Sequence, residues 1–161
     1  MNDAAAGDHK EILQWIFEQE HDGGSDHALE LTAKNGRMDM VQWLLDRRLG
    51  RYALYSMKST ICKGHLDIVK YLNERQMVGG ASDMMNEAAT HGHLDIVKWL
   101  CEKYRDEPYS VFPPYYRSED NDGYSSQTAM DKAAGMDHLH VLEFLHSLVE
   151  SAKAEDPICS D

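Results

Sequence analysis

The stretch that decides the fold is GHLDIVKWL, residues 92–100, because the chain contains it more than once. A near-identical copy, GHLDIVKYL, occupies residues 64–72, and weaker copies are GRMDMVQWL (36–44), DHKEILQWI (8–16) and DHLHVLEFL (137–145). The aromatic residues of the copies, which mark the period, are Trp15, Trp43, Tyr71, Trp99 and Phe144. Three intervals are 28 residues and the fourth is 45, one period plus an insertion of 17. Such self-similarity predicts a repeat architecture.

Each copy has the pattern of an amphipathic helix. In the best copy the apolar residues recur at helical spacing: Leu94, Ile96, Val97, Trp99 and Leu100. Asp95 in the first turn suits the positive end of the helix dipole, and Gly92 before it can take the left-handed conformation that reverses the chain. We therefore predict second helices of the repeats near residues 9–19, 37–48, 65–76, 93–104 and 138–152.

A second pattern with smaller residues precedes each of these helices. It reads LELTAKN (29–35), MKSTICK (57–63), MNEAATH (85–91) and MDKAAGM (130–136). Small residues allow close helix approach, so each repeat is interpreted as two antiparallel helices joined by a tight turn. Neither helix can bury its apolar face alone, which favours an all-α solenoid of stacked repeats.

The pattern AATHGHLDIV, residues 88–97, resembles the ankyrin repeat, and the resemblance runs in phase from Ala4 to about Leu148. It implies about 4.5 to 5 helix-turn-helix repeats in one domain, residues 1–155, with a flexible tail at 156–161. Ankyrin repeats usually span about 33 residues and open with Thr-Pro-Leu-His. The corresponding residues here are Asp83, Met84, Met85 and Asn86. Because the repeats are shorter where the family has its β-hairpin, we expect little or no strand.

Composition limits the class of protein. With 42% hydrophobic and 27% charged residues the chain should fold, and it lacks an apolar run long enough for a membrane span. The polar N-terminus and three unpaired-looking cysteines, Cys62, Cys101 and Cys159, favour a cytoplasmic, intracellular protein, although a nuclear or secreted mature form stays open. The net charge of -12 argues against nucleic acid as a partner.

Residues 91–101 combine potential metal ligands, His91, His93, Asp95 and Cys101. However, the histidines at the starts of the second helices, His9, His65, His93 and His138, occupy one repeat position. Residues spaced by one repeat width cannot converge on one ion, so we interpret them as polar groups that satisfy free backbone groups at helix starts. Only His91 and His140 could then join one of these recurring histidines as the second ligand of a metal ion. A metal-dependent enzyme is therefore the least favoured alternative.

No phosphate-binding loop, nucleophile elbow or zinc-protease motif is present in the sequence. We predict a protein that is not an enzyme, with no catalytic, cofactor-binding or metal-binding residue. The resemblance instead implies a protein-protein interaction module that binds a partner protein through its concave face. A monomer is expected; the alternative is a self-assembling segment of a longer array, with an exposed apolar face around Ile12, Leu13 and Ile16.

Residues 34–75 hold nine Lys or Arg against four acids. These are either solvated helix faces or a stripe for an acidic or phosphorylated partner. The candidate residues for partner binding in this region are Lys34, Arg47, Arg48, Arg51, Tyr55, Lys58 and Lys63.

The insertion near residues 106–122 is rich in proline and aromatic residues. Its candidate binding residues are Tyr109, Phe112, Pro113, Pro114, Tyr115 and Tyr116. One interpretation is a surface loop that packs its rings onto the repeats, and another is a recognition element. Residues 113–116 also fit Pro-Pro-X-Tyr, which resembles the ligand motif of WW domains, so a WW-domain ligand or adaptor is a further alternative.

Overall fold

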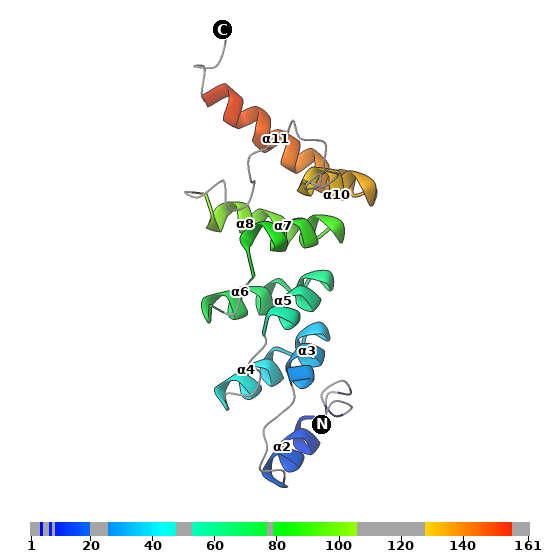
Figure 1. Cartoon of the computed structure of the whole chain (residues 1–161), viewed down its shortest axis with the longest axis vertical. Coiled ribbons are helices and arrows are strands. Elements are labelled where there is room, and N and C mark those ends of the chain that lie inside the picture. The colour runs from blue at the N-terminus through cyan, green and yellow to red at the C-terminus, as the bar shows by residue number, and fades with distance from the viewer. Residues whose placement is uncertain are drawn as a thin grey trace, which may run out of the picture. The chain divides into compact units, whose positions relative to one another are not determined.

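A computed structural model describes residues 4, 7, 9–19, 26–47, 53–76, 79–105 and 128–155, without the side chains of 13, 17, 26, 53–55 and 152–155. Every regular element in these ranges is an α-helix (Figure 1). The helices are α2 (Lys10–Gln19), α3 (Asp26–Lys34), α4 (Met38–Asp46), α5 (Ala53–Cys62), α6 (Leu66–Glu74), α7 (Ala81–Thr90), α8 (Leu94–Lys103), α10 (Ala129–Gly135) and α11 (Leu139–Glu155). The predicted all-α helix-turn-helix fold is thereby confirmed for the described residues.

The chain divides into two compact units. Unit 1 spans residues 1–80 and contains α2 to α6, and unit 2 spans residues 81–161 and contains α7, α8, α10 and α11. In unit 1, α3 packs on α4 and α5 packs on α6, while the first helices α3 and α5 lie side by side (Figure 1). In unit 2, α7 packs on both α8 and α10, and α11 packs on α10 and α8. Each unit therefore repeats one helix-pair arrangement.

The core of each unit consists of the apolar positions that recur with the repeat. In unit 1 the residues exposed by 1% or less include Leu29, Met40, Val41, Leu44, Met57, Ile61, Ile68 and Leu72. In unit 2 those at the same limit include Met85, Ala88, Ala89, Ile96, Val97, Leu100, Ala133, Val141 and Leu145. Several buried residues of the first helices are alanines, among them Ala28, Ala33, Ala88 and Ala133, and small side chains allow neighbouring helices to approach closely.

Glycine in the left-handed conformation closes the turns inside the repeats. Gly36 has φ 71° and Gly92 has φ 72°, as predicted for Gly92. At the turn between α7 and α8, the amide of Gly92 donates to the carbonyl of Ala89 at 3.3 Å, and that of His93 donates to the carbonyl of Ala88 at 3.0 Å. These bonds satisfy carbonyls that the end of α7 leaves free. In the last turn Asp137 occupies the equivalent position with φ 60°.

Polar groups near the helix ends and in the core have local partners. Thr128 and Asp131 form a capping box at the start of α10, in which the Thr128 amide donates to Asp131 Oδ2 at 2.9 Å. The buried Thr32 donates its hydroxyl to the Ala28 carbonyl at 2.9 Å. The last helix continues to Glu155, beyond residue 152, and no proline lies between Leu139 and Pro157 to interrupt it. None of the described helices is long and apolar enough to cross a membrane.

Candidate interaction surface

Three lysines of unit 1 lie on neighbouring first helices. Lys34 ends α3, Lys58 lies within α5, and Lys63 follows the end of α5; all three side chains are exposed. Since α3 and α5 are side by side, the repeat architecture brings together residues that are 24 to 29 positions apart in the sequence. We call Lys34, Lys58 and Lys63 the lysine face.

One acid of α3, Glu30, has partners on the same surface. Ser59 Oγ of α5 donates a hydrogen bond to Glu30 Oε1 at 3.1 Å. Glu30 Oε2 also lies 3.4 Å from Nδ1 of His27, an interaction that becomes an ion pair only when the imidazole is protonated. The Glu30 carboxylate is thus engaged within unit 1.

Arg47 lies elsewhere in unit 1. It follows the end of α4, where its guanidinium stacks 4.2 Å from the centroid of the Trp43 ring. In the same way, Arg75 lies 4.9 Å from the Tyr71 ring, and it also forms an ion pair with Asp46 at 3.0 Å. Because paired helices are antiparallel, Arg47 is one helix length, about 13 Å, from the turn that follows Lys34. The structure therefore does not bring Arg47 to the lysine face.

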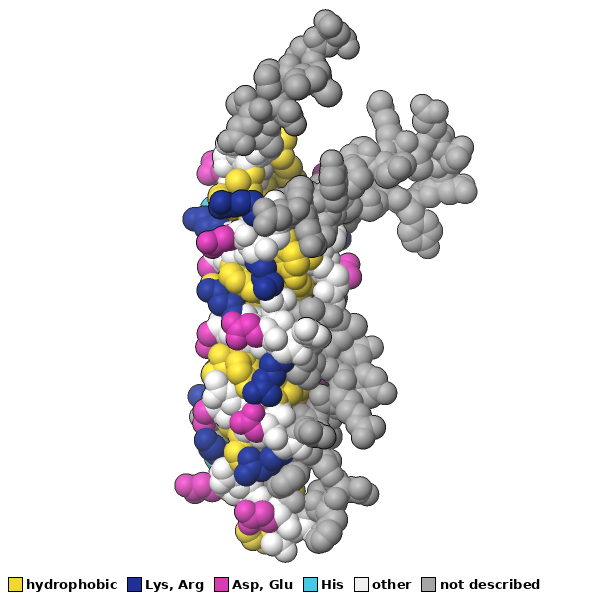
Figure 2. All heavy atoms as spheres, turned by 90° about the vertical axis from the view of Figure 1, so that its left-hand side faces the viewer, with side chains coloured by type: hydrophobic (Ala, Val, Ile, Leu, Met, Phe, Trp, Pro, Cys, Tyr) yellow, Lys and Arg dark blue, Asp and Glu magenta, His cyan; other side chains and the backbone are white. Residues whose placement is uncertain are grey.

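Figure 2 looks onto the side where α4 and α6 end. Basic, acidic and hydrophobic side chains alternate there, and no single sign of charge dominates (Figure 2). Such mixed surfaces are typical of solvated helix faces, for which ion pairs contribute little to stability. Among the described residues, this side therefore shows no cluster of a single charge sign (Figure 2).

The remaining candidates for partner binding lie outside the described residues. These are Arg48, Arg51, Tyr109, Phe112, Pro113, Pro114, Tyr115 and Tyr116. The backbone of Tyr55 belongs to α5, but its side chain is not among those described. Their roles remain predictions from the sequence.

The recurring histidines link neighbouring helix pairs. His65 Nε2 lies 3.0 Å from the carbonyl oxygen of Lys34, and His138 Nε2 lies 3.0 Å from that of Thr90. We expected these histidines to satisfy backbone groups at the starts of their own helices. For His65 and His93 this was wrong, because neither side chain caps its helix. The ring of His65 instead extends to the turn of the preceding pair, where it contacts the Lys34 carbonyl oxygen and Gly36.

Glycine is required under these rings for a second reason besides its φ angle. A Cβ atom on Gly36 would lie 2.7 Å from Cε1 of His65, and one on Gly92 would lie 2.6 Å from Nδ1 of His138. Both distances are shorter than ordinary van der Waals contact. The histidine ring therefore fits in this place only when the preceding repeat has glycine at its turn.

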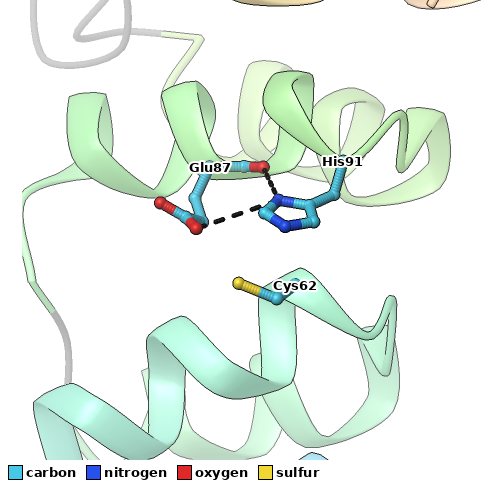
Figure 3. Close-up of side chains that lie close together, drawn as sticks. All are labelled: Cys62, Glu87 and His91. Carbon is cyan, nitrogen blue, oxygen red and sulfur yellow. Dashed lines mark hydrogen bonds and ion pairs between the residues drawn. The ribbon is translucent and has the colours of Figure 1, made fainter. Parts of the chain in front are cut away.

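The two other histidines considered as metal ligands also face backbone carbonyls. His91 Nδ1 lies 3.1 Å from the Glu87 carbonyl oxygen and 3.8 Å from Glu87 Oε1, one helical turn earlier (Figure 3). His140 Nε2 lies 2.9 Å from the carbonyl oxygen of Gly92. The rings of His91 and His93 are nearly parallel, with centroids 6.3 Å apart. These contacts are those of histidines that order a turn.

Among the residues that the structure describes, two titratable groups have shifted pKa values. The hydrogen bond from Lys10, at 3.2 Å, lowers the pKa of the Asp39 carboxyl below its ordinary value, and this ion pair connects α2 with α4. Burial raises the pKa of the Cys101 thiol to about 11, because desolvation disfavours the thiolate. A thiol that stays protonated is a poor nucleophile and metal ligand, which supports the interpretation that Cys101 serves packing.

Comparison with known protein families agrees with the fold and its periodicity. The family model described as ankyrin repeats, in three copies, matches residues 1–107, roughly two thirds of the chain. No curated protein matches the sequence. Ankyrin repeats are generally protein-protein interaction modules that bind protein partners, and they are typically not enzymes. With its paired helices, glycine turns and 28-residue period, this chain belongs to the ankyrin repeat family.

Proposed function

We propose that the chain is a non-enzymatic protein-binding module whose lysine face binds an acidic segment of a partner protein. The observation that carries this proposal is the exposure of Lys34, Lys58 and Lys63 on helices that lie side by side. The Glu30 carboxylate of α3 accepts a hydrogen bond from Ser59 of α5, so this pair joins the two helices that carry Lys34 and Lys58. Complementary charge mainly accelerates encounter and selects the partner.

The distribution of charge between the units supports this choice of partner. Unit 1 holds 10 Lys and Arg against 12 Asp and Glu, whereas unit 2 holds 6 against 16. An acidic segment would be repelled by unit 2 and steered toward the lysine face of unit 1. Lysine ammonium groups accept carboxylates and phosphates alike as point charges, so a phosphorylated segment suits the same surface.

The experiment compares two triple charge reversals that change the net charge equally. The test variant is Lys34→Glu, Lys58→Glu and Lys63→Glu, and the control is Lys70→Glu, Lys98→Glu and Lys103→Glu on second helices. Fluorescence anisotropy would measure the binding of a labelled peptide of alternating Glu and Ser at low salt. A phosphoserine version of the peptide, tested alongside, separates the two kinds of acidic segment.

We expect the test variant to lose at least about tenfold in affinity, equivalent to about 1.4 kcal/mol, because three cationic contacts become repulsive. The affinity of the control variant for the peptide should stay within about twofold of that of the parent chain. Only long-range repulsion is altered in the control, and salt screens it. Equal losses in both variants would show that net charge alone drives binding. That result, or the absence of binding by the parent chain, would refute the lysine face as the binding surface.

A further inference from the structure

Side chains of neighbouring repeats in unit 1 meet at a constant sequence separation of 29 residues. Three side-chain contacts have this separation: Lys10 with Asp39 at 3.2 Å, Ser59 with Glu30 at 3.1 Å, and Arg75 with Asp46 at 3.0 Å. The first joins α2 to α4, the second joins α5 to α3, and the third joins the end of α6 to the end of α4. A residue on the surface of one repeat of unit 1 therefore lies beside the residue 29 positions later.

This register places Lys34 beside Lys63, because these two residues of the lysine face are also 29 positions apart. Each of them comes four residues, about one helical turn, after a member of the bonded pair Glu30 and Ser59. His65 supports the same placement, since its Nε2 lies 3.0 Å from the Lys34 carbonyl oxygen and it follows Lys63 by two residues. Packed helices are about 8–10 Å apart, and two flexible lysine side chains can reach one anion across that separation.

Lys34 and Lys63 differ from the other pairs at this separation because they carry the same charge. Each of the three contacts above joins groups that attract one another, either as an ion pair or as a hydrogen bond to a carboxylate. The two lysines are exposed, and neither ammonium group forms an ion pair or hydrogen bond with another residue that the structure describes. Neighbouring ammonium groups repel one another, and an anion bound between them relieves that repulsion.

We propose that Lys34 and Lys63 together bind the phosphate group of a phosphorylated side chain in the partner protein, an inference that rests on the function proposed above. A phosphoserine carries a charge of about −1.5 to −2 at pH 7 and three acceptor oxygens, so it can accept hydrogen bonds from both ammonium groups at once. A glutamate carries a single negative charge and leaves one of the two positive charges without compensation. The lysine pair therefore selects phosphoserine over glutamate at one position of the bound segment.

Peptides that differ at a single position test this preference. The central residue is phosphoserine, glutamate or serine, and the flanking glutamates are the same in every peptide. Fluorescence anisotropy with the full chain at neutral pH and low salt would measure the three affinities. We expect the parent chain to bind the phosphoserine peptide at least about fivefold more tightly than the glutamate peptide, because charge-assisted hydrogen bonds form to both lysines. The serine peptide should bind most weakly.

Three single variants show whether the lysine pair causes the preference. Lys34→Gln and Lys63→Gln each remove one ammonium group from an exposed position, and glutamine has nearly the helix propensity of lysine, so both variants should unfold like the parent chain. In each, the preference for phosphoserine over glutamate should fall to within about twofold. The matched control is Lys70→Gln, which removes the same charge from an exposed lysine of α6 and should keep the full preference.

The outcomes separate this proposal from the function on which it rests. If the parent chain bound the phosphoserine and glutamate peptides equally well, the phosphate site would be refuted, while the lysine face would stand as a surface for acidic segments. Full preference in Lys34→Gln or Lys63→Gln, or its loss in Lys70→Gln, would also overturn the assignment to the lysine pair. A parent chain that bound none of the peptides would refute the lysine face and the phosphate site together.

Discussion

His138 places its Nε2 atom 3.0 Å from the carbonyl oxygen of Thr90 and its ring directly over Gly92. One side chain thereby links two helix pairs of unit 2 through a hydrogen bond and a close packing contact. His65 makes the same link in unit 1, with the Lys34 carbonyl and Gly36. Repeat proteins derive their stability from such contacts between neighbours, so the pair of histidine and glycine should have a measurable energy.

Gly92→Ala should destabilise the chain by more than about 1 kcal/mol, because a left-handed φ already costs alanine about that much. The new Cβ would also meet the His138 ring at 2.6 Å. The measurement is the free energy of unfolding in urea. Gly135→Ala is the matched control: a Cβ there meets nothing within 4 Å, and alanine should stabilise the end of α10 slightly.

The double variant Gly92→Ala with His138→Ala separates the two causes. Removing the ring should recover the part of the loss that is due to the clash, while the cost of the φ angle remains. If Gly92→Ala were as stable as the parent chain, the close packing of His138 on this turn would be disproved.

Leu100→Ala should cost about 2–5 kcal/mol, the usual range for a leucine truncated in a core. Leu100 is 0% exposed, and the equivalent residues Leu44, Leu72 and Leu145 are exposed by 1% or less. Leu139→Ala, at a 60% exposed position, serves as the control and should change the free energy of unfolding by less than about 0.5 kcal/mol. A similarly small effect of Leu100→Ala would contradict the alignment of the repeats.

The periodicity of the sequence was sufficient to predict the helix pairs and their buried positions. Leu100 could be assigned to the core because its copies recur every 28 residues at helical spacing. The contact of Arg47 with Trp43 could also have been found, since residues four apart share one side of a helix. The bond from His138 to Thr90 could not, because the partners are 48 residues apart and the direction of the ring decides it.

The candidate binding surface was predicted less completely than the core. The repeat register correctly placed Lys34 and Lys58 on neighbouring helices. Arg47 was grouped with these lysines because it belongs to the same basic stretch of the sequence. In the structure it lies at the end of α4, away from the turn that follows Lys34. Basic residues that are close in the sequence need not be close on the surface, because their positions depend on which end of a helix carries each side chain.

Ser56→Ala should leave stability unchanged or raise it by up to about 1 kcal/mol. Ser56 is 0% exposed, and none of the residues that the structure describes hydrogen bonds to its Oγ. Alanine already occupies the equivalent repeat position at Ala28 and Ala129. Removing a buried hydroxyl without a partner eliminates its desolvation cost and leaves little empty volume. Urea unfolding would measure the effect, and a loss above about 1 kcal/mol would mean that Oγ has a partner.

Cys101 should react slowly with iodoacetamide in the folded chain, because burial raises its thiol pKa to about 11. The group is neutral below that pH, so the thiolate is scarce at pH 8 and increases only as the pH approaches 11. A chain with Cys62→Ser and Cys159→Ser leaves Cys101 as its single thiol. Its alkylation at pH 8 should be at least about tenfold slower when folded than in urea, where an ordinary thiol pKa near 8.5 applies. Equal rates in the two states would show that the Cys101 thiol is accessible and not stabilised in its protonated form.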